Sequence, residues 1–355
     1  MTPNRWRFII ALLLFFLSSL SLVSETLSAE KANIFIYHRF GESRYPSTNI
    51  DADVFADHLQ YLHDSGKKVL PLKEVVRAFR TGEVLPSDAV VLTVDDAFDS
   101  FLAKAMPLLK KYRYPVTLFV NTDGVGSSGY LDWDQLRHLA RNGVDIGNHT
   151  ATHDYLLERK EGETGAMWES RIRDDITRAQ DAFDRELGMR PELFAYTYGE
   201  YSPELVEIVR DLGFIAAVAQ QSGVASPASD LFLLPRFPMG GPFASLSSFK
   251  SKVNMQPLDI EVLDPQTPII DGNNPPILSL RVRSSQYDLG QLQGFVQGNN
   301  DLDIKVDATR EGVIVVQAEK PLTGRRNKYT LTAPLKDGSG WAWFSQPWFR
   351  PDSGL

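Results

Sequence analysis

The feature that most constrains the fold of this chain is an alternation that runs from Asn33 to about Met239. Short apolar runs rich in β-forming residues are followed by amphipathic segments of helical period. This pattern is typical of β/α units, in which a helix connects each parallel strand to the next and covers the sheet. Because such crossovers are right-handed, six or seven units predict a closed or nearly closed β/α barrel, with an open doubly wound sheet as the alternative.

The individual elements follow from apolar runs, caps and stop residues. The expected strands lie at residues 33–37, 89–94, 115–120, 144–147, 193–196 and 214–219. The expected helices lie at residues 52–66, 100–112, 131–143, 171–188 and 203–213. Asp51 and Ser202 are expected to cap the first and last of these helices, because a side-chain oxygen at that position accepts a free helix N–H.

The amino-acid composition of the chain changes after about Gln256. Residues 256–275 are rich in Pro, Asp and Asn, which predicts a linker. Residues 276–355 then alternate apolar and polar positions with turns between them, which predicts a small all-β domain of the sandwich type. The predicted fold is therefore α/β, with a barrel domain over residues 30–255 followed by a small β domain.

Residues 1–29 have the composition of a secretory signal peptide. Arg5 and Arg7 precede an apolar run from Phe8 to Leu17, and small and polar residues lead to an expected cleavage near Ala29. The alternative is a retained membrane anchor, but the apolar run is short for a bilayer span. We therefore expect an exported protein without a membrane span after cleavage, located in the periplasm or cell envelope or secreted.

Composition and charge restrict the function classes. The chain has no cysteine, so disulfides do not stabilise it although export would permit them. Its formal net charge of −8 becomes −9 once the expected signal peptide is removed, which makes nucleic acid a poor candidate as a partner. The sequence gives no basis for naming a protein partner.

Polar clusters directly follow three of the expected strands. His38 follows the first strand, Asp95 and Asp96 follow the second, and His149 and His153 follow the strand at 144–147. Because the C-terminal ends of barrel strands converge on one mouth, we expect these side chains to meet there.

Together the clusters supply the donors of a catalytic metal site. Two imidazoles and one carboxylate form a common open ligand set, and the second carboxylate is left to act as a general base. Each cluster alone has a simpler explanation: paired aspartates serve turns, a histidine pair can be surface polarity, and His38 could be a core histidine. Their joint placement at strand ends favours the metal site.

Several of these motifs, taken together, resemble those of a known protein family. Asp95 and Asp96 in "TVDDAFD", His149 and His153 in "GNHTATH", and the segment "RPELFAYTYGEYS" together resemble the polysaccharide deacetylases, carbohydrate esterase family four. The resemblance covers residues from about 33 to 239. It implies a distorted (β/α) barrel and hydrolytic removal of acetyl groups from sugars, as in hydrolases that act on carbon–nitrogen bonds other than peptide bonds.

The resemblance also implies residue roles. Asp95 would be the general base, and Asp96, His149 and His153 would hold zinc, with nickel and cobalt as alternatives. Tyr198 would donate its backbone N–H to the tetrahedral oxyanion, a contact typically worth on the order of 3 kcal/mol.

Three departures from the family pattern bear on mechanism. Ala97 stands where a glycine usually follows the aspartate pair, and Ala195 stands where many members have an arginine that orients the base. No histidine follows His153, so the usual source of the general acid is missing. The leaving amine must then be protonated by His38, which we favour, by Asp95 after it gains a proton, or by water.

These departures resemble the branch that acts on exported exopolysaccharides such as poly-N-acetylglucosamine. The expected function is metal-dependent deacetylation of an N-acetylated polysaccharide in the cell envelope. Two alternatives remain open: a carbohydrate-binding protein on a weakly active or inactive barrel, and a peptidoglycan or chitin deacetylase.

Overall fold

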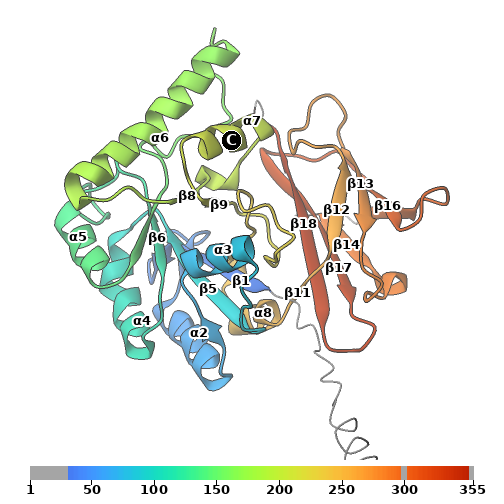
Figure 1. Cartoon of the computed structure of the whole chain (residues 1–355), viewed down its shortest axis with the longest axis horizontal. Coiled ribbons are helices and arrows are strands. Elements are labelled where there is room, and N and C mark those ends of the chain that lie inside the picture. Colours follow the sequence, from blue (N-terminus) through green and yellow to red (C-terminus); the bar gives the residue numbers. More distant parts are fainter. Residues whose placement is uncertain (1–30, 297–301, 352–355) are drawn as a thin grey trace, which may run out of the picture.

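The computed structural model of the chain describes residues 31–296 and 302–351 and consists of two lobes that lie side by side (Figure 1). The expected signal peptide at residues 1–29 lies outside the described residues. Within the described ranges, no helix combines the length and the apolar character needed to cross a bilayer.

The larger lobe is built on an eight-stranded parallel sheet, in the order β10-β1-β5-β6-β7-β8-β9 with β4 paired to β5. Its strands are β1 (Ala32–Tyr37), β4 (Lys68–Val69), β5 (Ala89–Asp95), β6 (Thr117–Val120), β7 (Asp145–Asn148), β8 (Leu193–Ala195), β9 (Ala216–Val218) and β10 (Phe237–Pro238). A separate parallel pair is formed by β2 (Arg39–Phe40) and β3 (Asn49–Ile50).

The segment before β10 brings the two edges of the sheet together. Leu234 forms a parallel bridge with Val218 of β9, and three residues later Phe237 pairs with Phe35 of β1. The sheet is thus a nearly closed, distorted barrel, which confirms the predicted fold class. Every residue of β1 and β5 is buried, as expected for central strands of a parallel sheet.

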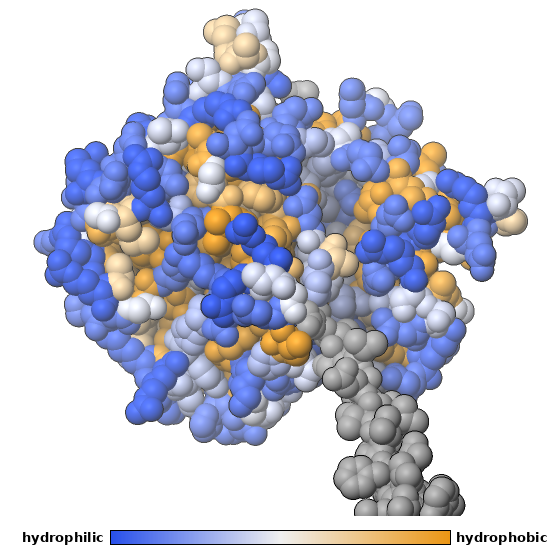
Figure 2. All heavy atoms as spheres, viewed as in Figure 1, coloured by the Kyte–Doolittle hydropathy of each residue, from blue (hydrophilic) through white to orange (hydrophobic). Residues whose placement is uncertain are grey.

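Helices surround this sheet (Figure 1). They are α2 (Ala52–Asp64), α3 (Leu72–Thr81), α4 (Met106–Tyr112), α5 (Trp133–Arg141), α6 (Gly165–Leu187), α7 (Pro203–Asp211) and α8 (Leu246–Val253). A π-helical turn, η1 (Phe101–Ala105), leads into α4, and short 3-10 turns form η2 (Thr197–Gly199) and η3 (Gly241–Phe243). On the face drawn in Figure 2, hydrophilic residues cover most of α5 and α6.

Capping explains where several helices start. Ser202 accepts a hydrogen bond from Leu205 N at the start of α7, as predicted. Asp51 stands at the N-cap of α2 but its side chain makes no capping hydrogen bond, so that part of the prediction is wrong. Helix α6 starts six residues before the predicted position, because Thr164 caps it by accepting from Met167 N.

The smaller lobe is an antiparallel sandwich with one parallel strand pair. One sheet has the order β11-β18-β17-β14 and the other β12-β13-β16-β15, with a shared apolar core between them. The strands are β11 (Gln256–Pro257), β12 (Ile260–Asp264), β13 (Ile277–Val282), β14 (Gln293–Val296), β15 (Leu302–Val306), β16 (Val313–Ala318), β17 (Arg326–Pro334) and β18 (Trp341–Phe349), with the 3-10 turn η4 (Leu289–Gln291) before β14.

The segment 256–275, expected as a linker, carries two of these strands. β11 pairs with β18 and β12 pairs with β13, so only the stretch after Asp264 connects without regular structure of its own. Pro257 and Asp264 end these two short strands, and the other prolines and aspartates that suggested a linker lie between and after them. Pairing with strands distant in sequence decided the structure here.

The two lobes pack through aromatic side chains and one buried ion pair. Trp343 of β18 meets Phe237 at 5.6 Å between ring centroids, and Phe349 meets Tyr201 at the same distance. Glu200 of the barrel and Arg325, the residue before β17, form a buried ion pair between the lobes. The β lobe is therefore packed firmly against the barrel.

Candidate active site

Three of the predicted residues converge at the mouth of the barrel. Asp96 follows β5, and His149 and His153 follow β7, and one ligand atom from each lies within 4.8 Å of the others. The Nε2 atoms of His149 and His153 lie 3.4 and 3.1 Å from Asp96 Oδ1. The structure thus brings together the three side chains that the sequence selected as metal ligands.

The hydrogen bonding of His149 fits a metal ligand. Its Nδ1 donates to the carbonyl of Ala195 at 2.8 Å, so in the neutral ring the lone pair is on Nε2, which faces Asp96. Asp96 Oδ1 is itself buried and accepts no hydrogen bond within the described parts of the chain. Lone pairs converge on one point here, and a divalent cation at that point would satisfy all of them.

Asp95 is held by a residue that the sequence analysis missed. Arg236 Nη1 and Nη2 donate to its two carboxylate oxygens at 2.7 and 2.8 Å, and both side chains are fully buried. Arg236 is in turn fixed by donating to Thr93 Oγ1 at 3.1 Å and to the carbonyl of Ala219 at 2.8 Å. The carboxylate is therefore locked in one orientation, 3.9 Å from His149 Nε2.

This pair corrects the expectation drawn from Ala195. An orienting arginine is present, supplied by the segment before β10 and not by β8. Burial alone would raise the pKa of Asp95, but the charge of Arg236, the nearby His149 and the hydrogen bonds from Arg236 outweigh it and hold the pKa below its usual value. One signal in the sequence pointed to it: an arginine inside the apolar run "LFLLPRFPM" needs a buried partner.

His38 lies in the same pocket as two of the three candidate ligands, Asp96 and His153. The pocket has a volume of about 670 Å³, within the range of small-ligand sites, and His38, Asp96, His153 and Tyr198 all line it. Burial lowers the pKa of His38, while the charges of Asp96 and Asp95 oppose that shift. The predicted acid, two of the predicted ligands and the predicted oxyanion donor therefore line one cavity.

Tyr198 reaches the pocket from a strained turn after β8. Its φ is +57°, and its ring stacks on Tyr155 at 3.9 Å and meets the edge of His153 at 4.7 Å. The next residue must be glycine, because Gly199 has φ +71° and a Cβ there would lie 2.4 Å from Gln220 Cβ.

Backbone strain concentrates around this site. Among the described residues, six non-glycine residues have positive φ, and five of them lie in the three loops that carry the site: Asp96, Ala97, Thr150, His153 and Tyr198. Ala97, at the usual glycine position, adopts φ +57° with its Cβ buried. Left-handed conformations of this kind cost on the order of 1 kcal/mol or more each and cluster at functional sites.

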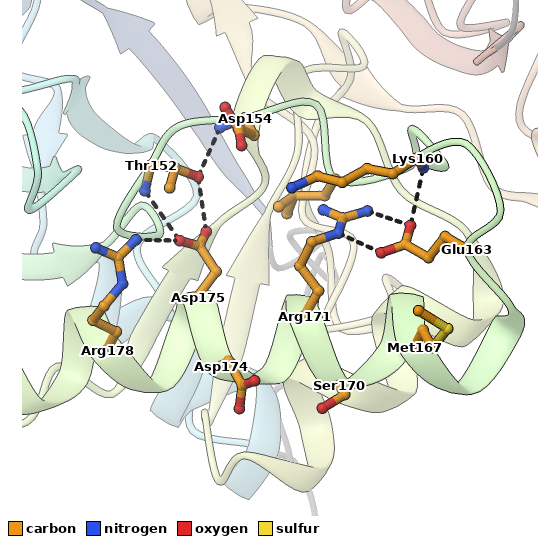
Figure 3. Close-up of a pocket in the computed structure, with 11 residues that line it drawn as sticks. Thr152, Asp154, Lys160, Glu163, Met167, Ser170, Arg171, Asp174, Asp175 and Arg178 are labelled. Atoms are coloured by element: carbon orange, nitrogen blue, oxygen red, sulfur yellow. Dashed lines mark hydrogen bonds and ion pairs between the residues drawn. The ribbon is translucent and has the colours of Figure 1, made fainter.

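Helix α6 supports the loop that carries the two histidines (Figure 3). Asp175 accepts hydrogen bonds from the backbone N and the hydroxyl of Thr152 at 3.2 and 3.1 Å, and Arg178 donates to the same carboxylate at 3.1 Å. Because Thr152 immediately precedes His153, this contact positions one of the candidate ligands. Nothing in the sequence singles out Asp175, because helix periodicity alone does not show what this side chain faces.

The comparisons agree with this geometry. A family model described as polysaccharide deacetylase matches residues 82–217, a range that contains Asp95, Asp96, both histidines and Tyr198. Over these residues the barrel is therefore similar to a polysaccharide deacetylase domain.

Individual relatives are similar over a longer stretch. The poly-beta-1,6-N-acetyl-D-glucosamine N-deacetylase of Escherichia coli (strain K12) is 25% identical over an alignment of 305 residues, which covers 73% of this chain but only 45% of that relative. Among solved structures, the deacetylase PplD of Streptococcus pyogenes in complex with acetate has a TM-score of 0.57 and 25% identity, covering 63% of this chain and 99% of that one. IcaB from Ammonifex degensii has a TM-score of 0.54 and 26% identity, covering 63% and 96%.

Proposed function

We propose that this protein is a metal-dependent deacetylase that removes N-acetyl groups from a polysaccharide of the poly-N-acetylglucosamine type outside the cytoplasm. The observation that carries the proposal is the convergence of Asp96, His149 and His153 next to a second, separately oriented carboxylate, Asp95. The substrate class is supported by the names of the relatives that the chain resembles.

Asp96, His149 and His153 would hold the cation, for which zinc is the first candidate and nickel and cobalt are alternatives. Three protein ligands leave coordination positions open. A divalent cation at this point supplies Lewis acidity, which lowers the pKa of water and polarises the acetyl carbonyl.

Asp95 is suited to accept the proton of the attacking water. Its pKa is held low, so it is ionised across the neutral range, and Arg236 keeps its carboxylate in one orientation. It does not need to bind the ion, because Asp96 is the carboxylate closer to both imidazoles. The two adjacent aspartates thus take different roles.

The backbone N–H of Tyr198 would donate to the oxyanion that forms on the acetyl carbon. The turn that holds Tyr198 is fixed by two hydrogen bonds, from Gly199 N to Tyr196 O and from Glu200 N to Thr197 O. A rigid donor costs little reorganisation when charge develops in the transition state.

His38 would protonate the leaving amine. It lines the pocket together with Asp96 and His153. Its lowered pKa makes its protonated form a stronger acid, at the expense of the fraction protonated at neutral pH. The product is a free amine and acetate.

The test combines acetate release with metal content. Wild type, Asp95→Asn and His149→Ala are assayed on N-acetylglucosamine polymers, chitin oligomers, peptidoglycan and xylan, and their bound metal is measured by elemental analysis. We expect Asp95→Asn to keep the metal and lose acetate release, and His149→Ala to lose both. His63→Ala, an exposed change on α2, is the matched control and keeps both.

Two results would overturn the proposal. Undiminished acetate release by Asp95→Asn removes the assigned base. A purified wild-type protein that holds no divalent metal after loading and releases no acetate from any of the polymers favours a carbohydrate-binding protein on the same barrel.

A further inference from the structure

The β lobe forms one wall of the candidate active-site pocket. Opposite His38 and Asp96, the pocket is lined by residues 324–328, at the start of β17, and by Pro347 and Phe349 of β18. This wall belongs to the lobe outside the residues that match the family model, which end at 217.

The wall is basic. Three of its five residues at 324–328 are cations: Arg325, Arg326 and Lys328. Arg325 is neutralised by a buried, bidentate ion pair with Glu200 of the barrel, at 2.8 and 2.9 Å. Within the described parts of the chain, Arg326 and Lys328 make no ion pair with a carboxylate.

Lys328 is held at the wall by a neutral partner. Its Nζ donates to Ser222 Oγ at 3.0 Å. Burial and the nearby charge of Lys252 lower the pKa of Lys328 to about 8, which is the behaviour of an ammonium group without an anionic partner.

Arg326 is close to the reacting centre. Its side chain is exposed, and its guanidinium lies 5.1 Å from the ring centroid of Tyr198, which in turn contacts the ring of His153. One aromatic ring thus separates Arg326 from a candidate metal ligand. Arg326 therefore lies on the pocket wall beside the candidate site, where a sugar next to the reacting one can contact it.

Among the described residues that line the pocket, Asp96 is the only acid, and the proposed cation would neutralise it. The electrostatic potential in the pocket is therefore positive, because Arg326 and Lys328 keep their charges. Such a field attracts an anionic ligand and opposes the binding of an ammonium group.

We propose that the polysaccharide substrate carries an anionic group, a carboxylate or a phosphate ester, on the sugar adjacent to the one that is deacetylated, and that Arg326 binds this group. This inference rests on the proposed function and narrows its substrate class. The planar guanidinium is suited to two parallel hydrogen bonds with either oxyanion, and Lys328 adds a second positive charge beside it.

The experiment measures binding without turnover, in the full-length, metal-loaded Asp95→Asn variant. Three oligomers of equal length are titrated by calorimetry: neutral N-acetylglucosamine, N-acetylglucosamine alternating with a uronic acid, and N-acetylglucosamine bearing a phosphate ester. We expect one of the two acidic oligomers to bind at least about tenfold more tightly than the neutral one, which also decides between carboxylate and phosphate. The difference should shrink as salt is raised.

Two further variants assign the preference to the wall. Arg326→Gln should remove most of the preference for the acidic oligomer, and Arg326→Glu should reverse this preference. Both variants should bind the neutral oligomer with unchanged affinity. Lys305→Gln removes an exposed charge from β15, away from the pocket, and should leave the preference intact.

Equal binding of all three oligomers overturns the proposal. An equal loss of affinity for acidic and neutral oligomers in Arg326→Gln also overturns it, because it would show that Arg326 only maintains the structure of the wall. Failure of the deacetylase proposal is a separate result, because it shows as absent acetate release by wild type whatever the binding preference.

Discussion

Arg236 and Asp95, 141 positions apart in the sequence, face each other in a fully buried, bidentate ion pair at the centre of the barrel mouth. The pair joins the C-terminal end of β5 to the segment that closes the barrel before β10. In the proposed mechanism Arg236 is a positioning residue, because it would act on the reaction through the carboxylate it holds.

Removing this arginine should shift the pH dependence of the reaction. In wild type the pKa of Asp95 is depressed, so the base is ionised and the acidic limb of the kcat/KM profile lies at low pH. In Arg236→Met, burial is no longer offset by the guanidinium, the pKa of Asp95 rises, and the acidic limb moves to higher pH. The profile is measured at saturating metal.

The same change should destabilise the fold. A buried carboxylate left without its partner costs about 3–5 kcal/mol of unfolding free energy, measured by urea denaturation. Arg236→Lys keeps a charge and should shift the limb less. An acidic limb that stays in place in Arg236→Met would show that Arg236 does not set the pKa of the base.

His38→Gln tests the assignment of the general acid. The kcat of the variant on the amide substrate should fall roughly 100- to 10,000-fold, because an amine leaves only when protonated. The kcat on an aryl acetate should fall little, since a phenolate leaves without being protonated. Acetate release from both substrates is followed in parallel, and equal losses on the two would assign His38 to binding instead.

Asp175→Asn should weaken metal binding without touching a ligand. Asparagine can accept from Thr152 N but its amide nitrogen cannot accept from the Thr152 hydroxyl, so the loop before His153 loosens. We expect roughly a tenfold loss of metal affinity, measured by competition with a chelator, and recovery of activity at high metal concentration. Asp174→Asn, its exposed neighbour on α6, is the control.

Glu200→Gln tests the ion pair between the lobes. Glu200 is fully buried and Arg325 nearly so, and the loss of one partner should lower the free energy of unfolding by about 3–5 kcal/mol. Glu207→Gln, in an exposed pair with Arg210 on α7, should cost less than about 1 kcal/mol. Both are measured by denaturation with tryptophan fluorescence, and similar losses in the two variants would count against a special role for the buried pair.

The sequence predicted best what depends on local pattern. Helix α5 begins at a capping box formed by Asp132 and Gln135, and β5 is a continuous apolar run, so both were found nearly where they lie. The convergence of Asp96, His149 and His153 followed from one rule, that parallel strands end at a common mouth.

What the sequence did not predict depends on long-range contacts. Arg236 reaches Asp95 only because the barrel closes before β10, and β12 becomes a strand only because β13 lies beside it. The basic residues at 324–328 reach the pocket only because the two lobes pack together. Pairwise contacts across such distances leave no periodicity to detect.

The five left-handed residues around the mouth of the barrel have a consequence for how an ion would be taken up. Their unfavourable bends are imposed when the chain folds, so an incoming ion finds its donors already aimed at one point. Little conformational entropy then remains to be lost on capture. Uptake and release of the ion would leave the scaffold unchanged, and affinity would be governed by the donors alone.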